Sequence, residues 1–93
     1  MPYEKLFSTA KIANLELKNR IVMPAMGCSL AESSGESGPR IIKYYTERAK
    51  GGTGLLIVEN VSVDDPLGSN GTTQLRLDQD RYMPRFYELT EAC

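Results

Sequence analysis

Two short apolar runs dominate the hydrophobic pattern of the chain, and each ends in turn-forming or polar residues. The first covers residues 21–23, and the second covers residues 54–58 and is followed by Glu59. Continuous apolar runs of this length are typical of strands covered on both faces, as in a parallel sheet. Pro24 ends the first run because it has no N–H to donate to a neighbouring strand. The pattern therefore predicts two buried strands.

Between these runs, apolar residues recur at helical spacing. The stripe consists of Ile41, Tyr45 and Ala49. Proline suits the first helical position, so the helix is expected to begin at Pro39, capped by either Ser37 or Gly38. The glycines at 51–52 are expected to end it. Strand, helix and strand form a βαβ unit over residues 20–59, which predicts a right-handed crossover into a parallel pair.

The segment before the first strand alternates between polar and apolar residues over 11–18, which predicts a β-hairpin turning near Ala13 and Asn14. The side chains expected to point inward are Ile12, Leu15 and Leu17. An irregular arm is the alternative for this segment. After the second strand, residues 60–78 are expected to form a loop because they are rich in glycine, serine and aspartate.

A second helix is predicted over residues 79–93, with regular turns from Arg81 and either Asp78 or Asp80 as its cap. Its expected inner stripe is Tyr82, Phe86, Leu89 and Cys93. Two parallel strands and two helices leave strand edges exposed and apolar faces half covered. Since the chain also stops inside a helix, we expect residues 1–93 to be one partial domain, the first quarter of a larger α/β barrel or sheet.

The composition and charge of the chain argue against several classes of function. Among 93 residues, 11 are basic and 12 acidic, giving a net charge of -1, so no basic stripe predicts nucleic-acid binding. No run approaches the roughly 20 apolar residues of a membrane span, and a cytoplasmic location is expected. The chain has no histidine, and Cys28 and Cys93 show no metal-ligand spacing. Chemistry is therefore expected from a cofactor, from other residue types, or from sequence outside this chain.

The strongest candidate for binding is the turn after the first predicted strand. It consists of Pro24, Ala25, Met26 and Gly27. Small residues leave the backbone nearly bare there, and α/β proteins place flat ligands at the carboxyl ends of parallel strands. A plain strand-ending turn is the alternative interpretation.

Two motifs at matching spacing, residues 17–26 and 44–59, resemble the old yellow enzyme family of FMN-dependent oxidoreductases, as does the segment 80–92. The resemblance implies that this is the amino-terminal portion of a (β/α)8 TIM barrel with FMN at the carboxyl ends of its strands. The implied activity is hydride transfer from NAD(P)H through FMN to an activated C=C bond or similar small-molecule acceptor. The family's proton donors and substrate-binding residues lie later in the barrel, so no catalytic residue is expected here.

Carried over by position, the resemblance makes five residues flavin neighbours: Pro24, Ala25, Met26, Gly27 and Asn60. Family members often carry a hydroxyl or thiol where this chain has Gly27, so Cys28 is a candidate substitute for it. Glu59 is interpreted as structural, with its carboxylate accepting loop N–H groups. The adjacent tyrosines at 44–45 are interpreted as core residues because they fall at helical spacing.

A rival hypothesis is a non-catalytic barrel fragment that acts as an interaction module and covers its exposed strand edges by self-association or by pairing with a companion polypeptide. A third is an independent small α/β domain of unrelated function. Under the flavoenzyme hypothesis, the 93-residue chain alone is expected to bind FMN weakly or not at all.

Overall fold

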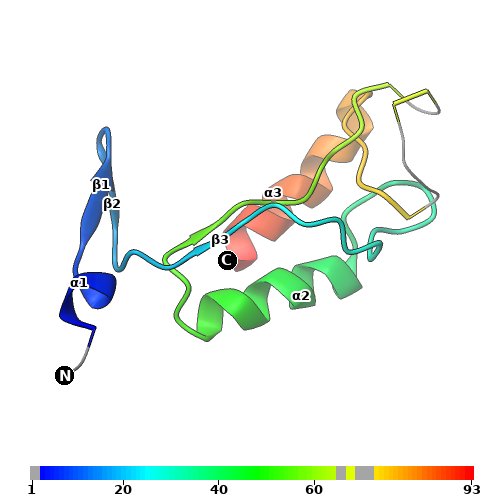
Figure 1. The fold of residues 1–93 in the computed structure, drawn as a ribbon. Coiled ribbons are helices and arrows are strands. Elements are labelled where there is room, and N and C mark those ends of the chain that lie inside the picture. The colour runs from blue at the N-terminus through cyan, green and yellow to red at the C-terminus, as the bar shows by residue number, and fades with distance from the viewer. Residues whose placement is uncertain (1–2, 65–66, 69–72) are drawn as a thin grey trace.

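The computed structural model describes residues 3–64, 67–68 and 73–93, and Figure 1 shows their path. Part of the predicted loop 60–78 therefore lies outside the described residues. The elements, in order, are α1 (Glu4–Phe7), β1 (Ala10–Ile12), β2 (Leu15–Leu17), β3 (Val22–Met23), α2 (Pro39–Lys50), β4 (Leu55–Leu56), the 3-10 helix η1 (Asp80–Tyr82) and α3 (Met83–Ala92).

The predicted hairpin is present. Strands β1 and β2 pair antiparallel with Ile12 opposite Leu15, which leaves Ala13 and Asn14 as the turn. Ala13 has a φ of 52°, the left-handed conformation that such tight turns require. The hairpin and α1 lie at one end of the molecule, apart from α2 and α3 (Figure 1).

The prediction that all three apolar hairpin side chains point inward is wrong for two of them. Leu17 is buried, whereas Ile12 and Leu15 are 54% and 55% exposed. Alternation places these side chains on one face, but of the three only Leu17 is packed tightly by other described residues. Leu15 borders an open cavity instead of a packed neighbour, and it and Ile12 therefore keep about half of their surface exposed.

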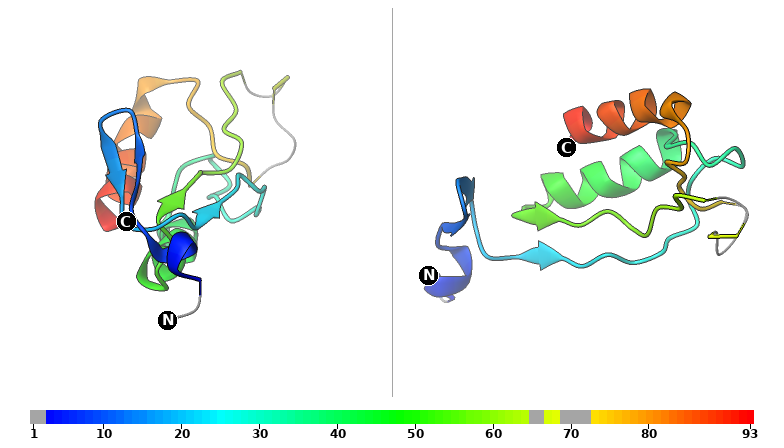
Figure 2. Two further views of the ribbon diagram at one scale, coloured as in Figure 1. Left: turned by 60° about the vertical axis from the view of Figure 1, so that its left-hand side comes forward. Right: turned by 90° about the horizontal axis from the view of Figure 1, so that it is seen from above.

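The predicted βαβ unit is also present. Strands β3 and β4 pair parallel, with Val22 opposite Leu55 and Met23 opposite Leu56. Figure 2 shows the two strands forming one layer and α2 and α3 forming a second layer beside them. Helix α2 keeps its predicted bounds, with Gly38 as the N-cap residue. The glycine at 52 has a φ of 111°, as expected for the exit from a helix.

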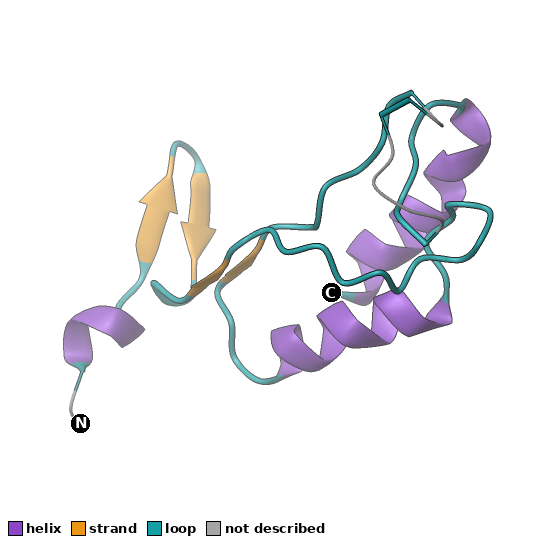
Figure 3. Cartoon of the chain, turned by 45° about the vertical axis from the view of Figure 1, so that its right-hand side comes forward, coloured by secondary structure: helices purple, strands orange, loops and turns teal. Residues whose placement is uncertain are grey.

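The expectation that both apolar runs are covered on two faces is wrong. Val22 and Ile57 are each 45% exposed, because the helices cover only one face of the strand pair among the described residues. The β3–β4 ladder is also short, and Figure 3 shows long loop segments following both strands. One further main-chain hydrogen bond, from Ile57 N to Met23 O, extends the pairing just beyond β4.

The core lies between the two helices and the strand layer. Its buried members are Ala31, Ile41, Tyr45, Leu75 and Leu89. The second predicted helix begins as η1 and continues as α3, with Tyr82 and Leu89 buried as expected. Neither predicted aspartate provides a side-chain cap: Gln79 is the N-cap residue of η1, and Asp78 pairs with Arg76 at 2.9 Å. Cys93 is exposed.

Candidate functional site

The predicted binding turn follows β3 directly and is open to solvent. All four of its residues, 24–27, are exposed, and Met26 is 48% exposed. An open turn with little side-chain bulk can present backbone atoms to a flat ligand. The turn therefore has the accessibility that the sequence interpretation requires.

Asn60, the fifth predicted residue, lies beside Gly27. A Cβ atom built on Gly27 would stand 3.4 Å from Asn60 Oδ1. The strand register explains this proximity: Val22 pairs with Leu55, and the same offset carried forward matches Gly27 with Asn60. The structure thus brings together two predicted residues from the carboxyl ends of neighbouring parallel strands, and the exposed Asn60 amide can both donate and accept hydrogen bonds there.

Glu59 joins the two halves of this site. Its Oε2 atom accepts a hydrogen bond from the backbone N–H of Cys28 at 2.6 Å, and its own N–H donates to the Tyr45 hydroxyl at 2.8 Å. The residue is only 3% exposed. Glu59 therefore accepts a loop N–H group, as the sequence interpretation expected. The sequence interpretation did not predict the hydrogen bond to the Tyr45 hydroxyl. A signal for it is that the buried stripe carries a tyrosine, whose hydroxyl needs a partner, where phenylalanine would fill the same space without one.

Cys28 differs from the turn that precedes it because it is half-buried and packs against the core. Burial raises the pKa of its thiol, and the neighbouring Glu59 carboxylate raises that pKa further. Both effects favour the protonated thiol over the thiolate. This packing gives no support to Cys28 as a substitute for a hydroxyl at Gly27.

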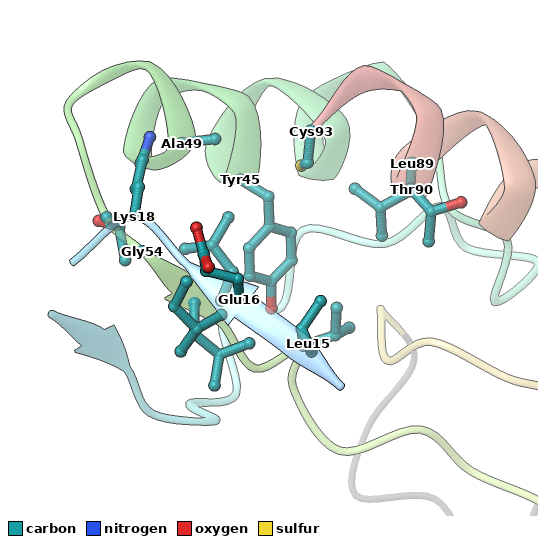
Figure 4. A pocket seen from close by; sticks show the side chains of 14 residues that line it. Leu15, Glu16, Lys18, Tyr45, Ala49, Gly54, Leu89, Thr90 and Cys93 are labelled. Carbon is teal, nitrogen blue, oxygen red and sulfur yellow. The ribbon is translucent and has the colours of Figure 1, made fainter. Parts of the chain in front are cut away.

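A cavity of about 410 Å³ lies elsewhere, between β2, β4, α2 and α3. Figure 4 shows Leu15 and Glu16 on one side of it, with Leu89 and Thr90 of α3 and the adjoining Cys93 on another. None of the five predicted flavin neighbours lines it. The cavity is thus separate from the exposed turn and is bounded mainly by apolar side chains.

The tyrosines at 44–45 pack edge to face with their ring centroids 5.1 Å apart, and Tyr45 is 1% exposed, consistent with core positions. Cys28 and Cys93 are free thiols. Across residues 3–64, 67–68 and 73–93, no three cysteine or carboxylate side chains gather as a metal site. Within the same described ranges, no helix is long and apolar enough to cross a membrane.

Residues 5–93 match the family described as NADH:flavin oxidoreductase / NADH oxidase. The chain is 53% identical over 90 residues to an NADH oxidase of Thermoanaerobacter brockii, covering 97% of this chain and 14% of that protein. A 2-naphthoyl-CoA reductase structure superposes with a TM-score of 0.92 at 31% identity, covering 97% of this chain and 14% of that one. The old yellow enzyme from Pichia sp. AKU4542 gives a TM-score of 0.83 at 27% identity, covering 95% and 22%.

These matches identify the architecture as well as the sequence relationship. The strand pair, the two helices and the preceding hairpin correspond to the amino-terminal portion of an α/β barrel. The described chain contains only partial sheets of such a barrel. It spans about one seventh of the length of the NADH oxidase that it matches.

Proposed function

Because the chain belongs to the NADH:flavin oxidoreductase / NADH oxidase family, we propose that it is the amino-terminal part of an FMN-dependent oxidoreductase and forms one wall of its flavin site. FMN is the cofactor of this family, and NAD(P)H is its hydride donor. The proposed wall consists of Pro24, Ala25, Met26, Gly27 and Asn60. The proposed reaction passes hydride from NAD(P)H to an activated C=C bond or a similar small-molecule acceptor.

The observation that supports this proposal most is that Gly27 and Asn60 lie side by side after the two parallel strands. Gly27 presents backbone beside Asn60 because it has no side chain, and a Cβ built on it would lie at van der Waals distance, 3.4 Å, from Asn60 Oδ1. An isoalloxazine ring needs a flat wall and polar groups at its edge. The exposed turn and the Asn60 amide fit both needs, so the residues present suit FMN.

When bound, FMN supplies the two-electron chemistry that the side chains of this chain lack. The chain's own residues would bind and orient it: the 24–27 backbone lies open for ring contact, and the Asn60 amide offers an NH2 group that donates and a carbonyl oxygen that accepts. No residue here is proposed to move a proton in the reaction. Those roles are assigned to the part of the enzyme outside these 93 residues.

The test is to express the longest reading frame that contains this chain and measure its flavin content and NAD(P)H oxidation. Stoichiometric FMN that reoxidises with an enoate or quinone acceptor is the expected result. A colourless protein that does not bind added FMN would contradict the proposal. The 93-residue chain alone is expected to bind FMN with a dissociation constant above about 1 µM, since most of the barrel is missing.

A second candidate function is association of two copies of the chain without catalysis. Among the residues that the structure describes, the outer edges of β3 and β4 are unpaired, and the apolar residues Val22 and Ile57 are exposed; both features favour it. Size-exclusion chromatography tests this candidate, because a monodisperse monomer at high concentration would contradict it. A cytoplasmic location remains a prediction under either function.

A further inference from the structure

Glu59 is connected to both parts of the candidate site, the turn at residues 24–27 and Asn60. It directly precedes Asn60 in sequence, and its Oε2 atom accepts the N–H of Cys28, the residue that follows Gly27. We propose that Glu59 is a positioning residue whose carboxylate sets the placement of the Gly27 turn relative to Asn60 for flavin binding. This inference rests on the proposed function and adds to it a residue that has no direct role in flavin contact.

The position of Glu59 is itself fixed from the core. Its N–H donates to the hydroxyl of Tyr45 at 2.8 Å, and Tyr45 is 1% exposed in the middle of α2. Glu59 is therefore hydrogen-bonded through its main chain to Tyr45 of α2 and through its carboxylate to the main chain of Cys28. A turn attached in this way takes its position from the helical layer, in addition to the short β3–β4 ladder.

The choice of a carboxylate here supports positioning over simple space filling. Burying a charged group costs free energy unless it is well hydrogen-bonded, and Glu59 is 3% exposed. Its Oε1 atom has no hydrogen-bond partner among the described residues. An apolar side chain of similar size would avoid that cost but could not accept the Cys28 N–H. The hydrogen bond to the turn is thus what the carboxylate contributes.

Three variants of the flavin-loaded protein separate positioning from stability. Glu59→Leu removes the acceptor, Glu59→Gln retains a neutral oxygen acceptor, and Leu89→Ala weakens the core away from the site. For each, the FMN dissociation constant, the visible flavin spectrum and the Tm of the apoprotein are measured. Glu59→Leu is expected to weaken FMN binding by about tenfold and to shift the flavin bands. Glu59→Gln should restore binding to within roughly threefold of the wild type.

Leu89→Ala should lower the Tm without shifting the flavin bands. If Glu59→Leu behaves as Leu89→Ala does, with an unchanged spectrum and FMN affinity, the positioning role is wrong. If Glu59→Leu does not fold, Tyr45→Phe serves in its place, because it releases the main chain of Glu59 and should shift the same bands in the same direction. An unshifted spectrum in that variant would also overturn the inference.

The same measurements distinguish this inference from the proposed function. A wild-type protein that does not bind FMN would overturn both. A wild-type protein that binds FMN, together with Glu59 variants that leave the flavin unaffected, would overturn the positioning role alone.

Discussion

Asn19 and Gly52 are joined across the base of the βαβ unit: Asn19 Nδ2 donates a hydrogen bond to the Gly52 carbonyl oxygen at 2.6 Å. Asn19 Oδ1 also accepts the N–H of Ile21 at 3.0 Å, just before β3 begins. One buried amide therefore fixes the start of the first parallel strand to the connection between α2 and β4. The β3–β4 ladder consists of two residue pairs. Because so short a ladder provides little stability, a side-chain link of this kind is important for the stability of the sheet.

Asn19→Ala should lower the free energy of unfolding by about 1–3 kcal/mol, because a carbonyl and an N–H in a part-buried location lose their partner. Urea unfolding monitored by circular dichroism measures the change. Gln79→Ala, which truncates an exposed amide, should change it by less than about 0.5 kcal/mol. Equal effects of the two substitutions would show that the Asn19 link does not stabilise the fold.

Gly54→Ala should destabilise the chain by a similar amount through steric overlap. A Cβ at this position would overlap Asn19 Oδ1 and would lie 2.7 Å from the Asn19 carbonyl oxygen, closer than a side-chain carbon packs against oxygen. Accommodating it would push the base of the parallel strands apart, at a cost of about 1–3 kcal/mol. Gly27→Ala is the matched control, since its nearest contact would be 3.4 Å and its stability should be nearly unchanged. Thermal unfolding of the two variants side by side makes the comparison.

Local signals predicted the helices and the turns well. Helix α2 has the predicted bounds because Pro39 and the glycines at 51–52 act through local backbone geometry. The hairpin turn at Ala13 and Asn14 was predicted from the polar and apolar alternation on either side of it, since alanine itself does not favour the left-handed conformation found there. Helix α1, only four residues long, was not anticipated, because it lacks the repeated apolar spacing that identifies a longer helix.

Burial was predicted less well because the pattern of a segment does not say what covers it. The alternation at Ile12 and Leu15 identified a shared face but not that the face would be uncovered. At the candidate site, the sequence indicated the turn and Asn60 separately, whereas their contact follows from the strand register. The roles of Asn19 and of the Tyr45 hydroxyl depend on hydrogen bonds between distant segments, which no local pattern records.

Tyr45→Phe should destabilise the chain by about 1–3 kcal/mol, because the buried N–H of Glu59 loses the hydroxyl that it donates to. Tyr44→Phe removes the hydroxyl of the neighbouring tyrosine and is the matched control. It should have an effect below about 0.5 kcal/mol, since Tyr44 is only partly buried. Chemical unfolding of both variants measures the difference, and similar losses would argue against the importance of the Tyr45–Glu59 hydrogen bond.

The Cys28 thiol should react slowly with iodoacetamide at pH 7–8, because burial and the Glu59 carboxylate raise its pKa above the ordinary value of 9.0. The measurement uses Cys93→Ser so that Cys28 is the one remaining thiol. The pH at which its alkylation rate rises should be higher than the pH at which the rate rises for free cysteine. Glu59→Gln should move the profile to lower pH; a profile that stays in place would show that the carboxylate does not affect the thiol.

The same raised pKa predicts how stability depends on pH. The unfolded thiol ionises near its ordinary pKa, whereas the folded thiol stays protonated to higher pH. The folded state therefore binds more protons in that interval, and the free energy of unfolding should fall as pH rises from about 9 through the folded-state pKa. Cys28→Ser should flatten this part of the curve, as measured by urea unfolding at a series of pH values.

Gly27→Ser should raise the reduction potential of the bound flavin in the proposed enzyme. The position is exposed and lies beside Asn60 Oδ1, with space for a small side chain. A hydroxyl that donates to the flavin would stabilise the more electron-rich reduced form over the oxidised form. Each 1.4 kcal/mol of that difference corresponds to roughly 30 mV for a two-electron couple. Gly27→Ala adds the Cβ without the hydroxyl and should leave the potential near that of the wild type. Spectroelectrochemical titration of the three proteins measures the potentials, and equal values for serine and alanine would mean that this position does not contact the redox-active part of the flavin.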